Sequence, residues 1–180
     1  MQRDEKVRLR AELMAVRQSR TATEIETARA AVRSAVLTRC AQEHWRTVAA
    51  YVPLRTEPGS VELLDDLRRS GVRVLLPVLL DDADLDWTDV SALDAVVAET
   101  LGVEAIATAD AVLVPALAVA SDGTRLGRGG GSYDRALARA GEVPVAALLF
   151  DGELRERLPS EPWDWRVSAV VQPSGWRDLG

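Results

Sequence analysis

Short runs of valine, leucine and alanine alternate with longer segments of helical character along the chain. Each run has the length of a strand and is apolar throughout, as in strands that are buried on both faces. Strands that alternate with helices predict an α/β fold: a doubly wound, mostly parallel sheet with helices on both faces. The runs lie at 48–52, 72–78, 111–115, 145–150 and 167–171, with a shorter one at 85–87.

Four segments between these runs have helical patterns. The first places leucine and valine at helical spacing, and the second begins at Thr21 and Glu24, which fit a capping box. The third lies between Ser60, a capping residue, and Gly71, a typical helix stop. The expected helices are 4–18, 22–41, 60–70 and 132–140. With no internal repeat and no long linker, residues 1–180 are expected to form one domain.

Composition excludes several classes of partner. The chain has a net charge of −6 and a pI of about 4.9, so a nucleic-acid or anionic-membrane partner is not expected. No apolar stretch approaches the roughly 18 residues of a membrane span, and the charged N-terminus does not resemble a signal peptide. Cys40 is the only cysteine, which fits a reducing compartment. We therefore expect a cytoplasmic protein, and we expect a monomer.

The segment 125–135 is the strongest candidate for ligand binding. It contains four glycines in five residues, which let backbone N–H groups turn toward one point. Arg125 and Arg128 add positive charge, and Asp134 stands where the following helix begins. This combination indicates a phosphate cradle with a possible magnesium ligand beside it. It is neither a Walker A loop nor a dinucleotide fingerprint, and the alternative is a flexible surface turn.

Lys6 and Arg10 form a second candidate, one helical turn apart. Lys6 is the only lysine, whereas arginine occurs 21 times. A single lysine in a chain so biased toward arginine suggests that position 6 needs a compact ammonium. Gln2 and Met14 occupy positions where acidic helix partners would otherwise stand. A cationic stripe without such partners suits polyphosphate. The alternative is an ordinary solvated basic face.

Other candidates carry weaker signals. Because ligands of doubly wound sheets bind beyond the carboxyl ends of the strands, the loops 53–59 and 120–132 should open on one side. Glu57 in the first loop could bond a heterocycle, Asp164 could be a second metal ligand, and Trp87 or Trp163 could stack on a flat ligand. Cys40 and the single histidine, His44, do not make a zinc site or a nucleophilic pair.

The chain resembles the 5-formyltetrahydrofolate cyclo-ligase family. The family's long glycine motif and its preceding strand are matched by Asp110, Val114-Pro115-Ala116, Gly123, Arg125-Leu126-Gly127, Gly129, Gly131, Tyr133 and Asp134. Lys6, Leu9 and Arg10 match its N-terminal motif, Glu57 its folate-contacting loop, and Leu158, Pro159, Glu161 and Asp164 a segment near its end. Four positions depart from the pattern: Ser132 replaces a tyrosine, Trp163 a histidine, Glu153 a glutamine and Gln172 a threonine.

The resemblance implies a reaction and its ligands. The family uses ATP and Mg²⁺ to close 5-formyltetrahydrofolate into 5,10-methenyltetrahydrofolate through an iminium phosphate, releasing ADP and phosphate. Its fold is shared with sugar-phosphate isomerases and CoA transferases.

The resemblance also implies roles for individual residues. The implied catalytic residues are Lys6, Arg10 and Arg128, and the implied metal ligands are Asp134 and Asp164. ATP would contact Lys6, Arg10, Arg125, Leu126, Gly127, Arg128, Gly129, Gly130, Gly131, Ser132 and Tyr133. Folate would contact Val52, Glu57, Arg128, Gly129, Gly130, Gly131 and Ser132.

Two other functions remain open from the sequence. One is a sugar-phosphate isomerase-like enzyme on the same fold, which would not need a triphosphate grip from Lys6 and Arg10. The other is a non-catalytic homologue that binds nucleotide or folate, with Ser132 and Trp163 as signs of lost activity. Tight binding without turnover would distinguish this homologue from an enzyme.

Overall fold

The computed structural model describes residues 2–89, 99–162 and 164–180. Its main sheet has the strand order β10-β9-β7-β4-β1-β2-β3. The five inner strands are parallel to one another, and each of the two edge strands, β3 and β10, is antiparallel to its one neighbour. These strands are β1 (Thr47–Ala49), β2 (Arg73–Leu79), β3 (Leu85–Asp89), β4 (Ala111–Pro115), β7 (Val145–Leu148), β9 (Ala169–Gln172) and β10 (Gly175–Asp178).

The parallel strands follow a doubly wound order. Starting from β2, their order of appearance in the chain is second, first, third, fourth and fifth. The direction of winding therefore reverses between β1 and β4, which are neighbours in the sheet. A crevice opens outside the carboxyl ends of the strands at such a reversal, and ligands of this fold class bind there. The predicted fold class is confirmed.

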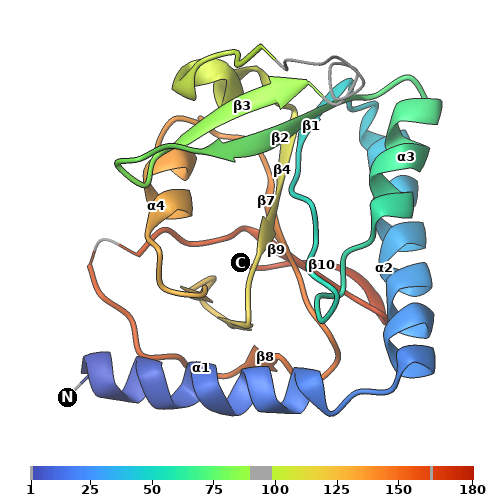
Figure 1. Cartoon of the computed structure of the whole chain (residues 1–180). Coiled ribbons are helices and arrows are strands. Elements are labelled where there is room, and N and C mark those ends of the chain that lie inside the picture. Colours follow the sequence, from blue (N-terminus) through green and yellow to red (C-terminus); the bar gives the residue numbers. More distant parts are fainter. Residues whose placement is uncertain (1, 90–98, 163) are drawn as a thin grey trace.

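Helices cover both faces of this sheet (Figure 1). Alternate residues along each strand face opposite sides, so Val74 and Leu76 pack toward one face and Leu75 toward the other. The first face is covered by α2 (Ala22–Glu43), which begins at the predicted capping box, and by α3 (Val61–Arg69). The second face is covered by the 3-10 helix η2 (Val103–Thr108) and by α4 (Ser132–Leu137).

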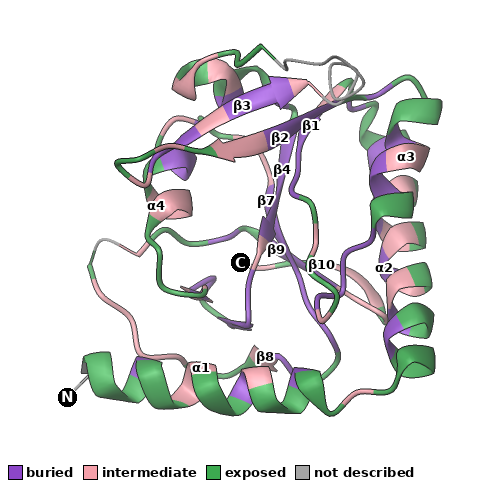
Figure 2. Cartoon of the chain, viewed as in Figure 1, coloured by how far each residue is buried: buried purple, intermediate pink, exposed green. Residues whose placement is uncertain are grey.

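The N-terminal helix α1 (Gln2–Gln18) lies apart from these two layers. It runs along the edge of the molecule near the small sheet β6-β5-β8 (Figure 1). Its Leu13 is buried against Leu117 and Leu126, and most of its remaining surface is exposed (Figure 2). The small sheet consists of β5 (Ala118–Ala120), β6 (Arg125–Leu126) and β8 (Leu154–Arg155). No helix of the described residues has the length and apolar character needed to cross a membrane.

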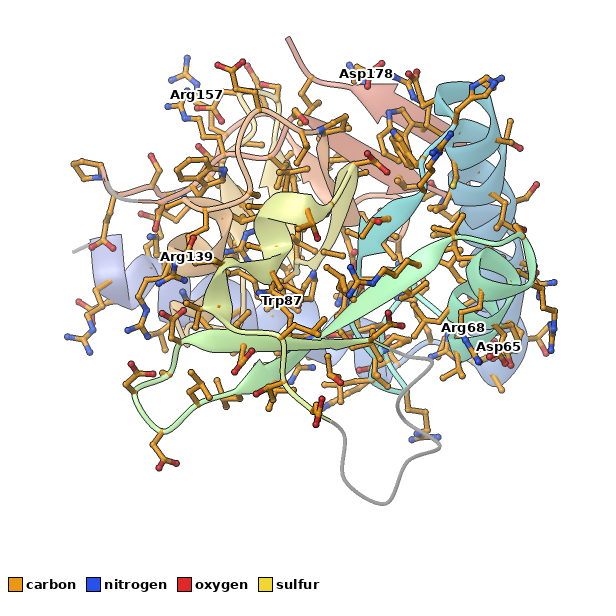
Figure 3. All side chains as sticks on the ribbon, turned by 90° about the horizontal axis from the view of Figure 1, so that it is seen from above. Asp65, Arg68, Trp87, Arg139, Arg157 and Asp178 are labelled. Carbon is orange, nitrogen blue, oxygen red and sulfur yellow. The ribbon has the colours of Figure 1, made fainter. Side chains whose placement is uncertain are left out.

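Several boundaries differ from the sequence predictions. The strand expected at 48–52 ends at Ala49, and the helix expected at 132–140 ends at Leu137. The sequence did not predict the small sheet or β10, because strands of two to four residues carry too little periodicity, and it did not predict the six-residue 3-10 helix η2. The segment expected as a loop at 120–132 contains β6. Trp87 lies in the interior, fully buried, rather than beside a ligand (Figure 3). Trp163 lies outside the described residues.

Candidate active site

A cavity of about 890 Å³ opens at the carboxyl ends of β1 and β4, where the winding of the sheet reverses. α1 forms one wall, the loop after β1 forms another, and the glycine-rich segment 125–135 forms a third. Six of its lining residues are basic and four are acidic, so this part of an acidic chain can attract an anion. The lining includes Lys6, Arg10, Val52, Glu57, Asp164 and every residue from Arg125 to Asp134.

Arg10 rests on the glycine-rich segment. Its Nε donates to the carbonyl of Gly127 at 2.9 Å. Gly129 has a φ of 105°, and a Cβ placed there would lie 3.4 Å from the Arg10 guanidinium carbon. A side chain at position 129 would therefore be strained by the backbone, and its Cβ would lie in contact with Arg10. The glycine thus lets α1 bring a cation directly onto the candidate phosphate cradle.

Lys6 is ion-paired and buried, with 7% of its surface exposed. Its Nζ lies 2.6 Å from Oδ2 of Asp164 and 3.3 Å from Oε2 of Glu161. The sequence predicts a lysine without acidic partners, and this is correct only for the neighbouring positions of its own helix. Its two acidic partners, Glu161 and Asp164, come from the far end of the chain. The backbone N–H of Glu161 also donates to Asp164 at 2.8 Å, which fixes this carboxylate in front of the lysine.

Arg125 is a buried support for the segment that carries it. Its Nη2 donates to Oδ1 of Asp134 at 3.1 Å, and its Nη1 donates to the carbonyl of Pro115 at 3.3 Å. The guanidinium carbon also lies 5.7 Å from the ring centre of Tyr133. Burial raises the pKa of Tyr133, so this phenol stays neutral. The ion pair with Asp134 therefore largely neutralises the charge of Arg125, whose side chain is buried. Arg128, in contrast, is half-exposed, and its contact with Glu57 is longer.

Glu57 faces the cavity from the loop after β1, and only 4% of its surface is exposed. Its Oε2 accepts the backbone N–H of Leu54 at 2.8 Å. Its Oε1 lies 3.6 Å from Nε of Arg128 across the cavity. Glu57 therefore joins two walls of the cavity, the loop after β1 and the glycine-rich segment, for which the family resemblance implies contacts with the ligands.

The two candidate metal ligands present carboxylate oxygens, which Mg²⁺ prefers. Arg125 and the backbone N–H of Trp165 both donate to Oδ1 of Asp134. Lys6 and the N–H of Glu161 both donate to Oδ2 of Asp164. The second oxygen of each carboxylate takes no part in these bonds. The described residues contain no group of three acidic, histidine or cysteine side chains that could hold a metal by itself.

Sequence reasoning missed some residues of the cavity. Glu161 belongs to the matched C-terminal segment, which is a signal, although the resemblance implies no role for it. Tyr51, Leu79 and Leu85 carried none, because apolar and aromatic residues in strands look alike from the sequence. Cys40 is buried in the core, where burial raises the pKa of its thiol, and His44 ends α2 in a left-handed conformation.

Tyr51 has a buried hydroxyl with no hydrogen-bond partner among the residues that the structure describes. Burial raises the pKa of this phenol well above its ordinary value, so the group is a neutral donor. Removing an unpaired buried hydroxyl costs no hydrogen bond. We therefore expect Tyr51→Phe to leave the thermal unfolding midpoint unchanged or raised. A fall of more than about 3 °C would show that the hydroxyl is bonded in solution.

Comparison with known proteins identifies the family. The family model described as the 5-formyltetrahydrofolate cyclo-ligase family matches residues 2–173. A 5-formyltetrahydrofolate cyclo-ligase of Mycolicibacterium smegmatis is 45% identical over 143 residues, covering 71% of this chain and 74% of the relative. The corresponding protein of Escherichia coli is 31% identical over 142 residues, covering 71% of this chain and 78% of the relative.

Solved structures show the same fold. The 5,10-methenyltetrahydrofolate synthetase of Aquifex aeolicus has a TM-score of 0.80 at 24% identity, covering 97% of this chain and 92% of that one. The synthetase of Mycoplasma pneumoniae has a TM-score of 0.79 at 20% identity, covering 93% of this chain and 98% of that one. The family model's match to residues 2–173 and the identity to the curated relatives show that the chain belongs to the 5-formyltetrahydrofolate cyclo-ligase family.

Proposed function

We propose that this chain is an ATP-dependent enzyme that closes 5-formyltetrahydrofolate into 5,10-methenyltetrahydrofolate and releases ADP and phosphate. The family and its curated relatives carry the name of this activity. The observation that supports it most directly is the cation-lined cavity at the reversal of the sheet, where α1 places Lys6 and Arg10 against the glycine-rich segment.

ATP and folate would share this cavity. Lys6, Arg10 and the segment 125–133 would hold the triphosphate, because they supply cations and backbone without bulky side chains. Val52, Glu57 and the segment 128–132 would border the folate. Arg128 lies within reach of Glu57 and belongs to both sets, so it stands between the two ligands.

The proposed chemistry needs charge neutralisation more than proton transfer. The 5-formyl oxygen attacks the γ-phosphorus of ATP, the bond to ADP breaks, and an iminium phosphate forms. The nitrogen at folate position 10 then adds to the formyl carbon and gives up its proton, and phosphate leaves with the formyl oxygen as the new ring closes. Lys6, Arg10 and Arg128 would stabilise the charge that develops on the transferred group. The cavity contains no histidine among its described lining residues, which suits a path of this kind.

Magnesium would complete the site. Asp134 and Asp164 would hold the ion through the oxygens that their present bonds leave unused, together with oxygens of the triphosphate. Mg²⁺ bound there would supply further neutralisation of phosphate charge. Asp164 already contacts Lys6. Bound Mg²⁺ and the ammonium of Lys6 would therefore contact neighbouring parts of the triphosphate.

The cellular setting is also a proposal. We propose that residues 1–180 act as one domain and as a monomer in the cytoplasm, with 5-formyltetrahydrofolate and ATP as partners. The acidic net charge supports the absence of nucleic-acid and anionic-membrane partners.

The test is an absorbance assay with omission of each component. Purified protein is mixed with 5-formyltetrahydrofolate, ATP and Mg²⁺, and the methenyl product is followed in the near ultraviolet. Product that forms only when all three are present supports the proposal. If folded protein binds ATP but yields no product, the chain is a binding homologue or acts on another substrate.

Replacing Asp134 with asparagine is expected to lower turnover by at least about tenfold, roughly 1.4 kcal/mol of transition-state stabilisation. The amide keeps an oxygen that can accept from Arg125 and the backbone N–H of Trp165, so the fold should persist. Turnover measured over a range of Mg²⁺ concentrations checks this, alongside unfolding midpoints. Near-normal turnover at every concentration would remove Asp134 from the metal site.

A further inference from the structure

Arg29 of α2 holds the turn at 54–57 from the side away from the cavity. Its Nε donates to the carbonyl of Glu57 at 3.1 Å. Its Nη2 donates to the carbonyls of Leu54 and Arg55 at 3.1 and 3.2 Å. Its Nη1 is paired with Glu26 at 3.0 Å, so all three nitrogens of the guanidinium are engaged. One side chain thus satisfies three backbone acceptors of a single turn.

The same turn shapes one wall of the cavity. The N–H of Glu57 donates to the carbonyl of Leu54 at 2.9 Å, and the N–H of Leu54 donates back to the Glu57 carboxylate at 2.8 Å. The turn lies between β1 and α3, outside both the sheet and the helices, so these local bonds and Arg29 hold it together. Because its carbonyls bond Arg29, the carboxylate of Glu57 remains on the cavity side.

Only an arginine can make this set of contacts. A guanidinium carries donors in a planar fork, whereas a lysine offers a single ammonium. The next arginine along the same face of α2, Arg33, points to a different partner: its Nε lies 2.7 Å from Oδ2 of Asp66 on α3. Arg29 and Arg33 therefore form a matched pair on one helix, one facing the turn and the other facing a neighbouring helix.

We propose that Arg29 is a positioning residue for folate recognition, acting through the turn that presents Glu57. This rests on the proposed function, in which Glu57 contacts the folate. The proposed triphosphate contacts come from α1 and the glycine-rich segment, which form other walls of the cavity, and the turn meets them at Arg128, which belongs to both ligand sets. Loss of Arg29 is therefore expected to weaken the use of folate and to spare the use of ATP.

The experiment compares Arg29→Met with Arg29→Lys and with the control Arg33→Met, which removes the same charge from the same helix. Amide hydrogen exchange is measured at Leu54 and Glu57, and KM is measured separately for 5-formyltetrahydrofolate and for ATP. In Arg29→Met we expect exchange at both amides and the folate KM to rise by about tenfold, with the ATP KM changed less than about twofold. Arg29→Lys should fall between this variant and the wild type, and Arg33→Met should match the wild type.

The two readouts separate the possible failures. Unchanged exchange in a folded Arg29→Met protein would overturn the inference that Arg29 holds the turn. Faster exchange with an unchanged folate KM would overturn its role in recognition. If the wild type forms no methenyl product, the proposed function fails, and the exchange comparison still decides whether Arg29 holds the turn. Equal unfolding midpoints for the Arg29 and Arg33 variants exclude a general loss of stability.

Discussion

Replacing Arg17 with methionine is expected to lower the free energy of unfolding by about 3–5 kcal/mol, because it leaves a buried carboxylate without its partner. Arg17 is 2% exposed and Glu153 3%. The guanidinium meets the carboxylate through two bonds, Nε to Oε1 at 2.8 Å and Nη2 to Oε2 at 2.7 Å. Nη2 also donates to the carbonyl of Ala116 at 2.6 Å. Urea unfolding of the variant and the wild type at neutral pH measures this decrease in the free energy of unfolding.

A second variant shows whether the unpaired charge causes the loss. Arg17→Met combined with Glu153→Gln removes the charge, while the amide oxygen can still accept the N–H of Phe150 as the carboxylate does. We expect the double variant to recover most of the lost stability. Arg8→Met, at an exposed position of the same helix, serves as the control and should change stability by less than about 0.5 kcal/mol. A double variant as unstable as Arg17→Met would contradict this explanation.

Replacing Lys6 with alanine is expected to lower turnover by at least about tenfold, equivalent to about 1.4 kcal/mol of transition-state stabilisation. The ammonium is the cation that α1 brings beside Asp164, a candidate metal ligand. Its removal takes a positive charge from the proposed triphosphate site. Steady-state kinetics with saturating ATP and folate measure the effect, and unfolding midpoints must match those of the wild type within a few degrees. Near-normal turnover would remove Lys6 from the site.

The variant Lys6→Arg tests whether charge alone is sufficient. The chain uses arginine 21 times and lysine once, and this lysine is 7% exposed between two carboxylates. A planar guanidinium is larger than an ammonium and places its donors differently. We therefore expect Lys6→Arg to lose activity as well, although less than Lys6→Ala. Full activity in Lys6→Arg would show that the site requires only a positive charge.

Arg17 also has a bearing on the departures from the family pattern. Glu153 stands where the family frequently has a glutamine, and the structure shows that its added charge is paired with Arg17. The pair joins the end of α1 to the segment after β7, close to the ring of Phe150. In this chain the departure at 153 therefore belongs to a structural contact that fixes α1, the helix that carries Lys6 and Arg10.

Local patterns in the sequence were sufficient to predict most of the fold. Strands such as 111–115 are buried on both faces, so their apolar runs are continuous and are easily recognised. The capping box of Thr21 and Glu24 marks the start of α2, since a cap depends on residues only three positions apart. Lys6, Arg10 and the segment 125–134 of the cavity lining could be identified because the N-terminal motif and the glycine motif are both local. Their roles in binding and catalysis stay predictions.

Only the tertiary structure decided how these parts meet. Lys6 acquires its acidic partners from residues more than 150 positions away, and no helical spacing can indicate such a pair. Arg29 bonds carbonyl groups of the turn at 54–57, and backbone acceptors carry no sequence signal at all. From the sequence Trp87 could either pack or stack on a flat ligand, and it packs into the core, where β3 pairs with β2. Short-range patterns determine secondary structure and burial, whereas partners across the fold are set by chain topology, which places distant side chains in one cavity.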